Sequence, residues 1–231
     1  MTDPRPVALV TGASSGMGRE IARDLARTHR IIAVGRDAER LSAVAAETGA
    51  EPWRLDVTDA DAFAERIGGL DRLDVLVHAA AIGRPLGVDA AGPDDWGVHF
   101  AVNVTAPAVI TRLALPLLRR AQGTVVFIGS GASTRPVPGS AVYSATKHAL
   151  RAVADVLRID EEPHRLRVAT IAPGQTDTEM LRGMVPAEQY APERYIRPES
   201  VAGAVRFVVD APADVQITDI AVRPRQEINR L

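Results

Sequence analysis

Short, wholly apolar runs alternate along this chain with longer segments whose apolar residues recur at helical spacing. Strands buried on both faces are apolar throughout, and parallel strands need crossovers that are usually helices. The alternation therefore predicts an α/β fold: a doubly wound parallel sheet with helices on both faces. We expect strands over residues 7–10, 31–34, 53–57, 75–79, 124–128, 168–171 and 217–222, and helices over 18–28, 38–48, 61–67, 143–159 and 199–209.

The composition excludes several classes of protein. The 231 residues are 46% hydrophobic and 24% charged, which suits a single domain over residues 1–231 that no linker or repeat divides. A net charge of -2 without clustered Lys and Arg predicts no nucleic-acid interface. Because the chain has no cysteine and its five histidines lack paired metal spacing, we expect no metal site.

Neither the N-terminus nor the most apolar segment indicates export or membrane insertion. The start, MTDPRPVALVTG, carries an acid and two prolines, whereas a signal peptide needs a basic start and a longer apolar stretch. Residues 101–118 are interrupted by Asn103, Pro107, Arg112 and Pro116, so we expect no membrane span there. We therefore predict a cytoplasmic protein.

A glycine-rich turn follows the first predicted strand, with the pattern T-G-x-x-x-G-x-G from Thr11 to Gly18. Glycines let the backbone approach a phosphate closely, and the helix that follows offers free N–H groups and a positive dipole end. Glycines also serve ordinary strand-to-helix turns, so this motif alone is weak evidence. We predict that it binds a phosphate through Gly12, Ser14, Ser15, Gly16, Met17 and Gly18.

Three residues suit proton transfer to a carbonyl oxygen. Tyr143 and Lys147 lie four residues apart in the helix-forming segment YSATKHALRAVADVL, so both project from one face. A lysine ammonium beside a phenol lowers the pKa of the phenol toward working pH, which lets the tyrosine exchange a proton with substrate. Ser130 follows a strand at the same edge of the sheet and can hydrogen-bond the substrate oxygen. An isolated Y-x-x-x-K pair is more often a solvated helix pair without a role.

The order of these motifs, with Asn103 in FAVNV and Pro173-Gly174 after a later strand, closely resembles the short-chain dehydrogenase/reductase family over nearly the whole chain. The resemblance implies one Rossmann-like domain with about seven parallel strands. It implies an oxidoreductase that transfers a hydride between a nicotinamide cofactor and a carbonyl or secondary alcohol. In that family's scheme Tyr143 is the acid/base, Ser130 positions the substrate oxygen, Lys147 also holds the nicotinamide ribose, and Asn103 anchors a water that relays protons.

The resemblance also assigns cofactor contacts beyond the glycine turn. Asp56 and Val57 are expected to meet the adenine, although Asp56 on its own reads as a helix N-cap. The segment 173–178 resembles the family's contact with the nicotinamide carboxamide. The remaining expected contacts are Ala80, Tyr143, Lys147, Pro173, Gly174, Thr176 and Thr178.

The second predicted strand ends in Gly35-Arg36-Asp37, where an adenosine ribose lies in sheets of this kind. An arginine can pair bidentately with a 2′-phosphate, which a carboxylate would repel. Asp37 is placed to cap the following helix, and Ser15 stands where many NADP-dependent members have a basic residue. We predict NADP(H) rather than NAD(H); in the alternative, Arg36 is a solvated loop residue.

Two stretches depart from the family pattern. His78-Ala79-Ala80-Ala81 replaces the usual N-N-A-G, so the usual asparagine hydrogen bond is lost, and we interpret His78 as a strand histidine rather than a replacement donor. The ending ITDIAVRPRQEI lacks the frequent D-G-G. It is more similar to the branch that holds serine/3-hydroxy acid dehydrogenases and clavulanate dehydrogenase.

The irregular segment 173–198 follows a strand end, and we interpret it as a substrate lid rather than a plain surface loop. Its apolar and aromatic residues predict a medium-sized carbonyl or secondary alcohol rather than a small, multiply charged acid. Glu179, Arg182, Glu188 and Arg194 weaken this prediction because any of them can face inward. The residues concerned are Met180, Leu181, Met184, Val185, Tyr190 and Tyr195.

The family usually assembles through two long helices, and segments 107–118 and 149–159 are apolar enough to serve, although the same faces can simply cover the sheet. We predict a homotetramer, with a dimer as second choice. Two alternatives for function remain: an NAD-dependent dehydrogenase of the same fold, and a non-catalytic NADP-binding sensor. A sensor has no need of Asn103, Ser130, Tyr143 and Lys147 together.

Overall fold

Seven parallel strands form one sheet in the computed structural model, which describes residues 4–226. The strand order is β3-β2-β1-β4-β5-β6-β7, so the chain reverses its direction of progress between β1 and β4. The doubly wound parallel sheet expected from the alternating pattern is confirmed. The strands are β1 (Val7–Thr11), β2 (Arg30–Gly35), β3 (Glu51–Arg54), β4 (Val75–His78), β5 (Thr124–Ile128), β6 (Arg167–Pro173) and β7 (Asp219–Val222).

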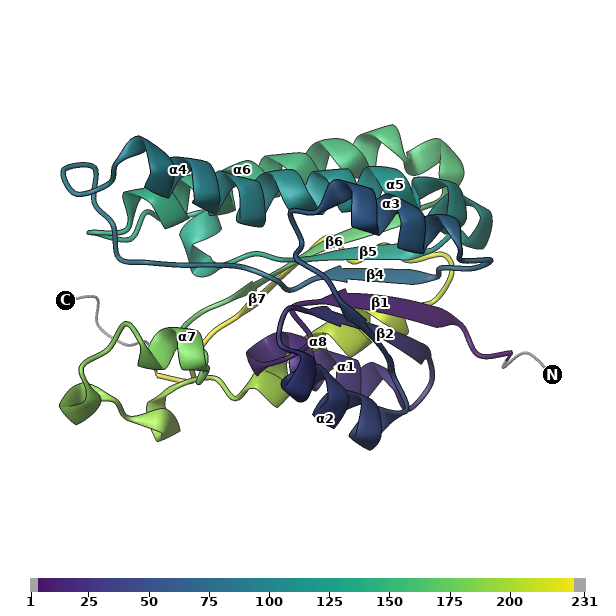
Figure 1. Ribbon diagram of the computed structural model, residues 1–231. Coiled ribbons are helices and arrows are strands. Elements are labelled where there is room, and N and C mark those ends of the chain that lie inside the picture. The colour runs from purple at the N-terminus through teal and green to yellow at the C-terminus, as the bar shows by residue number, and fades with distance from the viewer. Residues whose placement is uncertain (1–3, 227–231) are drawn as a thin grey trace.

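The central strands are buried at every position and mostly apolar, because helices cover both faces (Figure 1). In β1, Ala8 and Val10 belong to one hydrophobic cluster, and Val7 and Leu9 to the other. The first cluster lies between the sheet and three helices that form the lower layer of Figure 1: α1 (Gly16–Leu25), α2 (Ala38–Thr48) and α8 (Pro198–Val209). The second lies under α3 (Ala60–Gly68), α5 (Ala106–Ala121) and α6 (Ala141–Asp160).

One long helical stretch extends further than the sequence indicated, since only segment 107–118 was interpreted as one of two long helices. It comprises α4 (Pro93–Phe100), a π-helical turn (Ala101–Thr105) and α5. The prolines that interrupt the pattern are tolerated: Pro107 lies in the first turn of α5, where its missing N–H breaks no hydrogen bond, and the helix continues through Pro116.

The same stretch, Pro93–Ala121, is long and apolar enough to cross a membrane by length and composition alone, a test that the core helix of a globular protein also passes. In the fold, 44% of its most apolar window is buried inside the protein, and α3, α6 and β4 pack against it. Packing on the sheet thus accounts for many of its apolar positions.

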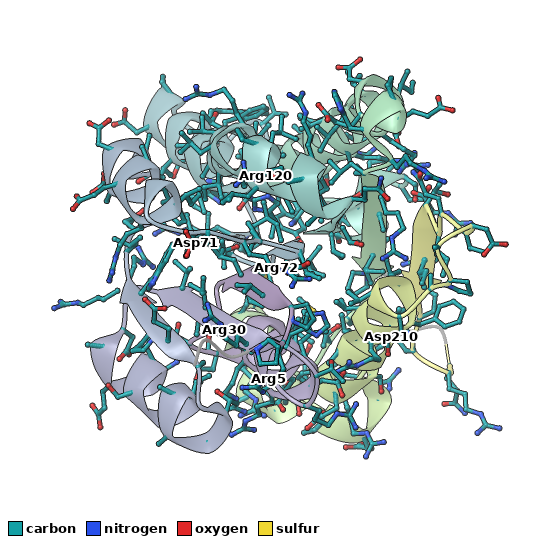
Figure 2. All side chains as sticks on the ribbon, turned by 90° about the vertical axis from the view of Figure 1, so that its right-hand side faces the viewer. Arg5, Arg30, Asp71, Arg72, Arg120 and Asp210 are labelled. Carbon is teal, nitrogen blue, oxygen red and sulfur yellow. The ribbon has the colours of Figure 1, made fainter. Side chains whose placement is uncertain are left out.

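The carboxyl ends of the strands lie toward the left of Figure 1, and the irregular segment lies there too, below the sheet. This segment contains α7 (Glu179–Arg182) and two 3-10 turns, Ala187–Gln189 and Pro192–Arg194. A bridge between Thr176 and Ile196 closes its base. The amino ends of the strands form the opposite edge, where Arg5, Arg30, Asp71 and Arg72 are displayed (Figure 2).

Candidate active site

The glycine turn between β1 and α1 is shaped for close approach of backbone segments. Gly12 has a φ of 69°, and a Cβ on it would lie 2.7 Å from the backbone nitrogen of Ala80. A Cβ on Gly18 would collide with the carbonyl oxygen of Gly12. Thr11 Oγ1 accepts hydrogen bonds from the backbone N–H groups of Ala79 and Ala80, both at 3.2 Å. The first strand and the loop after β4 are therefore locked together beside the N-terminus of α1.

A cleft of about 220 Å³ opens along this turn at the carboxyl edge of the sheet. Eleven of the predicted cofactor residues line it: Gly12, Ser14, Ser15, Gly16, Met17, Gly18, Arg36, Asp56, Val57, Ala80 and Thr178. The other predicted contacts lie outside its lining: Tyr143, Lys147, Pro173, Gly174 and Thr176.

The cleft also has lining residues that were not predicted as cofactor contacts. Gly35, Leu55, Ala79, Ala81 and Ile82 adjoin predicted positions, so their neighbours in the chain were a usable signal. The other three come from the π-helical turn and the lid: Val102 adjoins Asn103, Met180 was expected to give the lid an apolar side, and Glu179 was named as a lid charge that can face inward.

Arg36 lies at the end of the cleft nearest β2. Its Nη1 is 3.7 Å from Oδ2 of Asp56, and its side chain is 76% exposed, so it is available to an incoming anion. Hydrogen bonds from Thr58, helped by Arg36, hold the pKa of Asp56 below its usual value. The N-cap interpretation of Asp37 is confirmed, because its side chain accepts from the backbone N–H of Arg40.

Ser130, Tyr143 and Lys147 come together as the sequence predicts. Ser130 follows β5, where its Oγ accepts a hydrogen bond from the backbone of Ala132 at 3.1 Å and also bonds to the hydroxyl of Tyr143. Tyr143 and Lys147 lie in the first two turns of α6. The Lys147 Nζ lies 5.7 Å from the centroid of the Tyr143 ring and donates to the carbonyl oxygen of Ile128 at 2.9 Å.

Burial shifts both titratable groups. Lys147 is 2% exposed, and the loss of solvent lowers the pKa of its ammonium to about 8. The expected lowering of the Tyr143 pKa is not found here: burial of the hydroxyl raises this pKa, and the hydrogen bond with Ser130 only partly opposes the rise. The ammonium of Lys147 is directed to Ile128 instead, so burial dominates and Tyr143 keeps its proton at neutral pH.

Asn103 is buried in the π-helical turn and holds the loop after β4. Its Oδ1 accepts from the N–H of Ile82 at 2.9 Å, and its Nδ2 donates to the carbonyl oxygen of Ile82 at 2.8 Å and to Thr146 Oγ1 at 3.1 Å. Both amide hydrogens are thus occupied by protein atoms. A proton relay at this residue therefore has to use its main chain.

His78 behaves as the strand histidine that the sequence suggested. It is buried at the end of β4, its ring stacks on Phe127, and its Nε2 lies 2.8 Å from Thr111 Oγ1. Burial lowers its pKa to about 3, so the ring is neutral. Because it does not line the cleft, it is not a replacement for the missing asparagine as a cofactor contact.

The lid reaches both the cleft and the tyrosine. Met180 lines the cleft, and a Cβ on Gly83 would lie 3.1 Å from Cε of Met184 and 3.2 Å from Cδ2 of Tyr143. The loop after β4, the start of α6 and the lid therefore meet at Tyr143. Gly83 leaves room there because it has no side chain.

The charged and aromatic lid residues are largely engaged with other partners. Glu179 pairs with Arg40 on α2 at 2.7 Å. Asp177 accepts from Arg182 at 2.7 Å and from the Tyr190 hydroxyl at 2.5 Å, and the rings of Tyr190 and Tyr195 pack with centroids 4.9 Å apart. The lid thus has an internal polar cluster.

The comparisons with known proteins agree with this geometry. The family model for short chain dehydrogenase matches residues 6–189. The chain belongs to the short-chain dehydrogenase/reductase family. Within residues 4–226 no group of three or more His, Cys, Asp or Glu is placed to hold a metal ion.

Its similarity to individual members extends over almost the whole chain. Serine 3-dehydrogenase of Agrobacterium fabrum is 33% identical, over 94% of this chain and 92% of that protein. The closed form of a serine dehydrogenase complexed with NADP+ superposes with a TM-score of 0.85 at 31% identity, covering 94% of each chain. An alcohol dehydrogenase of the archaeon Thermococcus sibiricus, complexed with 5-hydroxy-NADP, gives a TM-score of 0.86 at 27% identity, covering 97% of this chain and 99% of that chain. The suggested branch is thus supported.

Proposed function

We propose that this oxidoreductase interconverts a carbonyl compound and an alcohol with NADP(H), using Tyr143 as its acid and base. The observation that carries the proposal is the convergence of Ser130, Tyr143 and Lys147 at the edge of the sheet where the glycine turn forms a cleft. A non-catalytic sensor would have no use for a buried lysine and a serine-bonded tyrosine at that edge.

The residues of the cleft fit a dinucleotide. Gly12 and Gly18 leave no space for a side chain, and the N–H groups at the start of α1 face a space suited to a pyrophosphate. Arg36 supplies a cation at the end of β2, which favours NADP(H) over NAD(H). NADP complexes among the relatives support the same cofactor. Asp56 and Val57 line the adenine end, and Thr178 lies beside Gly16 at the other.

The cofactor, when bound, supplies the hydride that reduces the carbonyl carbon. Ser130 hydrogen-bonds the carbonyl oxygen and orients it toward Tyr143. Tyr143, which burial keeps protonated, donates its proton to that oxygen and completes the alcohol. Lys147 stabilises the resulting phenolate and holds the nicotinamide ribose, and a proton returns to Tyr143 from solvent past Lys147 and the backbone of Asn103. Pro173, Gly174 and Thr176 belong to the strand end expected beside the carboxamide.

We expect an uncharged, medium-sized substrate. Met180 and Met184 give the lid an apolar side toward the cleft and Tyr143, while Glu179 and Arg182 are paired elsewhere. Small-molecule pockets are built from such apolar walls with few polar anchors. If only compact dicarboxylates were turned over, this expectation would be wrong.

The assembly is expected to be a homotetramer, with a dimer as second choice. Leu150 and Ala154 of α6 are buried against the sheet, whereas Val156 and Ile159 are 56% and 70% exposed. Covering the sheet therefore does not use all the apolar positions of this helix, and a second copy can cover the rest. Light scattering at micromolar concentration tests this expectation, and a monomer would contradict it.

The decisive experiment is steady-state oxidation of NADPH by a panel of ketones and aldehydes, followed by the fall in absorbance of the reduced cofactor. We expect turnover of apolar carbonyls and a preference for NADPH over NADH. Tight NADPH binding without turnover of any carbonyl or alcohol would favour the sensor, and preference for NADH would favour an NAD-dependent dehydrogenase.

A further inference from the structure

A single ion pair joins the lid to the half of the fold that forms the adenosine end of the cleft. Glu179, the first residue of α7, places Oε2 2.7 Å from Nη1 of Arg40 in the first turn of α2, although 139 positions separate them in sequence. Among residues 4–226, it is the only hydrogen bond or ion pair found between the lid, 173–198, and another element of the fold, apart from those at the base of the lid.

The second attachment of the lid is apolar and lies at the reaction end of the site. Met184 approaches Gly83 and Tyr143, while Met180, one helical turn earlier, lines the cleft. The lid is thus held at two points: by the Arg40–Glu179 ion pair beside the cofactor cleft, and by Met184 beside Gly83, close to Tyr143. Movement of one end changes the position of the other, because Met184 follows Met180 by only four positions.

Glu179 is poorly placed for a protein that binds a highly charged cofactor unless something neutralises it. Glu179 lines the same cleft as Gly16 and Arg36, where the pyrophosphate and the 2′-phosphate are expected. An unpaired carboxylate at this place repels both groups across a partly solvated gap. Arg40 removes that repulsion and, by the same contact, keeps α7 against the cleft.

We propose that Arg40 and Glu179 form a latch that holds the lid closed over bound NADP(H), with Arg40 acting as a positioning residue through Glu179. This inference rests on the proposed function for its cofactor, but the ion pair itself exists without it. The latch releases the cofactor when the pair opens, and its strength falls with ionic strength because both side chains are about half exposed or more.

The test compares Arg40→Ala, Glu179→Gln and the double variant by direct titration with NADPH. Because an exposed carboxylate is left facing the phosphates, we expect Arg40→Ala to weaken NADPH binding about threefold to tenfold at low salt, and less at high salt. In the double variant no charge remains to be neutralised, so the part of the loss that comes from repulsion should return, whereas the part that comes from the unlatched lid should remain. The control is Arg23→Ala, which opens another interhelical pair, with Glu47, and a pair with Glu20 on its own helix, both away from the lid.

The outcome that overturns the latch is a double variant that binds NADPH as tightly as the wild type, since the loss in Arg40→Ala would then come from the unpaired charge alone and not from an open lid. An Arg40→Ala variant that binds NADPH like Arg23→Ala would also overturn it. Trypsin cleavage after Arg182 and Arg194 gives a readout that needs no cofactor: it should be faster in Arg40→Ala than in Arg23→Ala. A wild-type protein that fails to bind NADPH while keeping this difference in cleavage contradicts the proposed function and leaves the latch supported.

Discussion

The two edges of the sheet carry charged residues in opposite ways. At the amino edge (Figure 2), a hollow of about 660 Å³ is larger than the cofactor cleft, and arginines and acids line it. Many of these groups satisfy one another: Arg72 bonds both carboxylate oxygens of Asp74, the Trp53 indole donates to Glu51, and Arg66 lies over the Trp53 ring. Such pairing is typical of a surface that holds strand ends together.

The carboxyl edge has a smaller cleft, but it buries titratable side chains whose charged forms burial disfavours. Lys147 is buried and pairs with no carboxylate of residues 4–226, and burial shifts its pKa and that of Tyr143. Groups whose pKa is displaced by burial beside a cleft are typical of catalytic sites. The comparison therefore teaches that volume does not identify the site in this molecule, whereas buried, shifted side chains at the strand ends do.

The largest effect should come from removing the tyrosine hydroxyl at the carboxyl edge. Tyr143→Phe keeps the ring and the fold but removes the transferable proton, so we expect carbonyl reduction to fall at least ~100-fold. NADPH binding should be nearly unchanged, because Tyr143 does not line the cofactor cleft. Turnover numbers and NADPH titrations of both proteins check this. Wild-type turnover by the variant would show that Tyr143 is not the acid and base, and the carboxyl edge would then lose its assignment as the catalytic edge.

One arginine from each edge of the sheet tests whether only the carboxyl edge recognises the 2′-phosphate of the cofactor. Arg36→Ala should lower the preference for NADPH over NADH, measured as the ratio of kcat/KM values, by roughly 10- to 100-fold, because a charge-assisted pair is lost. Arg72→Ala is the matched control at the amino edge, where Asp74 already binds the guanidinium. A ratio that stays constant in Arg36→Ala, or that changes equally in Arg72→Ala, contradicts the assignment of the 2′-phosphate to Arg36.

The pH dependence of catalysis should report the buried lysine. Lys147 is charged below its pKa of about 8 and neutral above it, and its ammonium stabilises the phenolate that forms when Tyr143 gives up its proton. We therefore expect kcat/KM for reduction to be level below pH ~8 and to fall about tenfold per unit above it.

Lys147→Arg serves as the control for this profile, because a guanidinium keeps its charge throughout the range and should abolish the alkaline limb. If the variant is too slow to follow, the wild-type profile alone decides. A level profile from pH ~7 to ~9.5 is inconsistent with a lysine whose pKa burial has lowered.

These contrasts were partly visible in the sequence. The strands, the glycine turn and the Tyr143–Lys147 spacing depend on local patterns, so they could be predicted. The raised pKa of Tyr143 and the engaged amide of Asn103 could not, because each depends on atoms far away in sequence: Ile128 for Lys147, and Ile82 and Thr146 for Asn103. Segment 107–118 was interpreted as a long helix, but its extension through α4 and the π-helical turn was not predicted.

The smallest effect on activity, and a clear one on stability, is expected at the amino edge. Asp74 accepts the backbone N–H of Val7 at 2.8 Å and both bonds from Arg72, and its own backbone bonds to Val7 and Thr124. Asp74→Ala leaves the partly buried Val7 N–H and the Arg72 guanidinium without their acceptor. We expect a loss of about 1–3 kcal/mol, seen as a melting temperature lower by several degrees.

Turnover of Asp74→Ala below that temperature should match the wild type, because the residue lies at the edge opposite Tyr143. Asp71→Ala provides the control: this exposed carboxylate lines the same hollow, and its loss should change stability by no more than about 0.5 kcal/mol. A fall in kcat for Asp74→Ala without a fall in melting temperature would mean that the amino edge communicates with the site. The assignment of stability to the amino edge and of catalysis to the carboxyl edge would then be wrong.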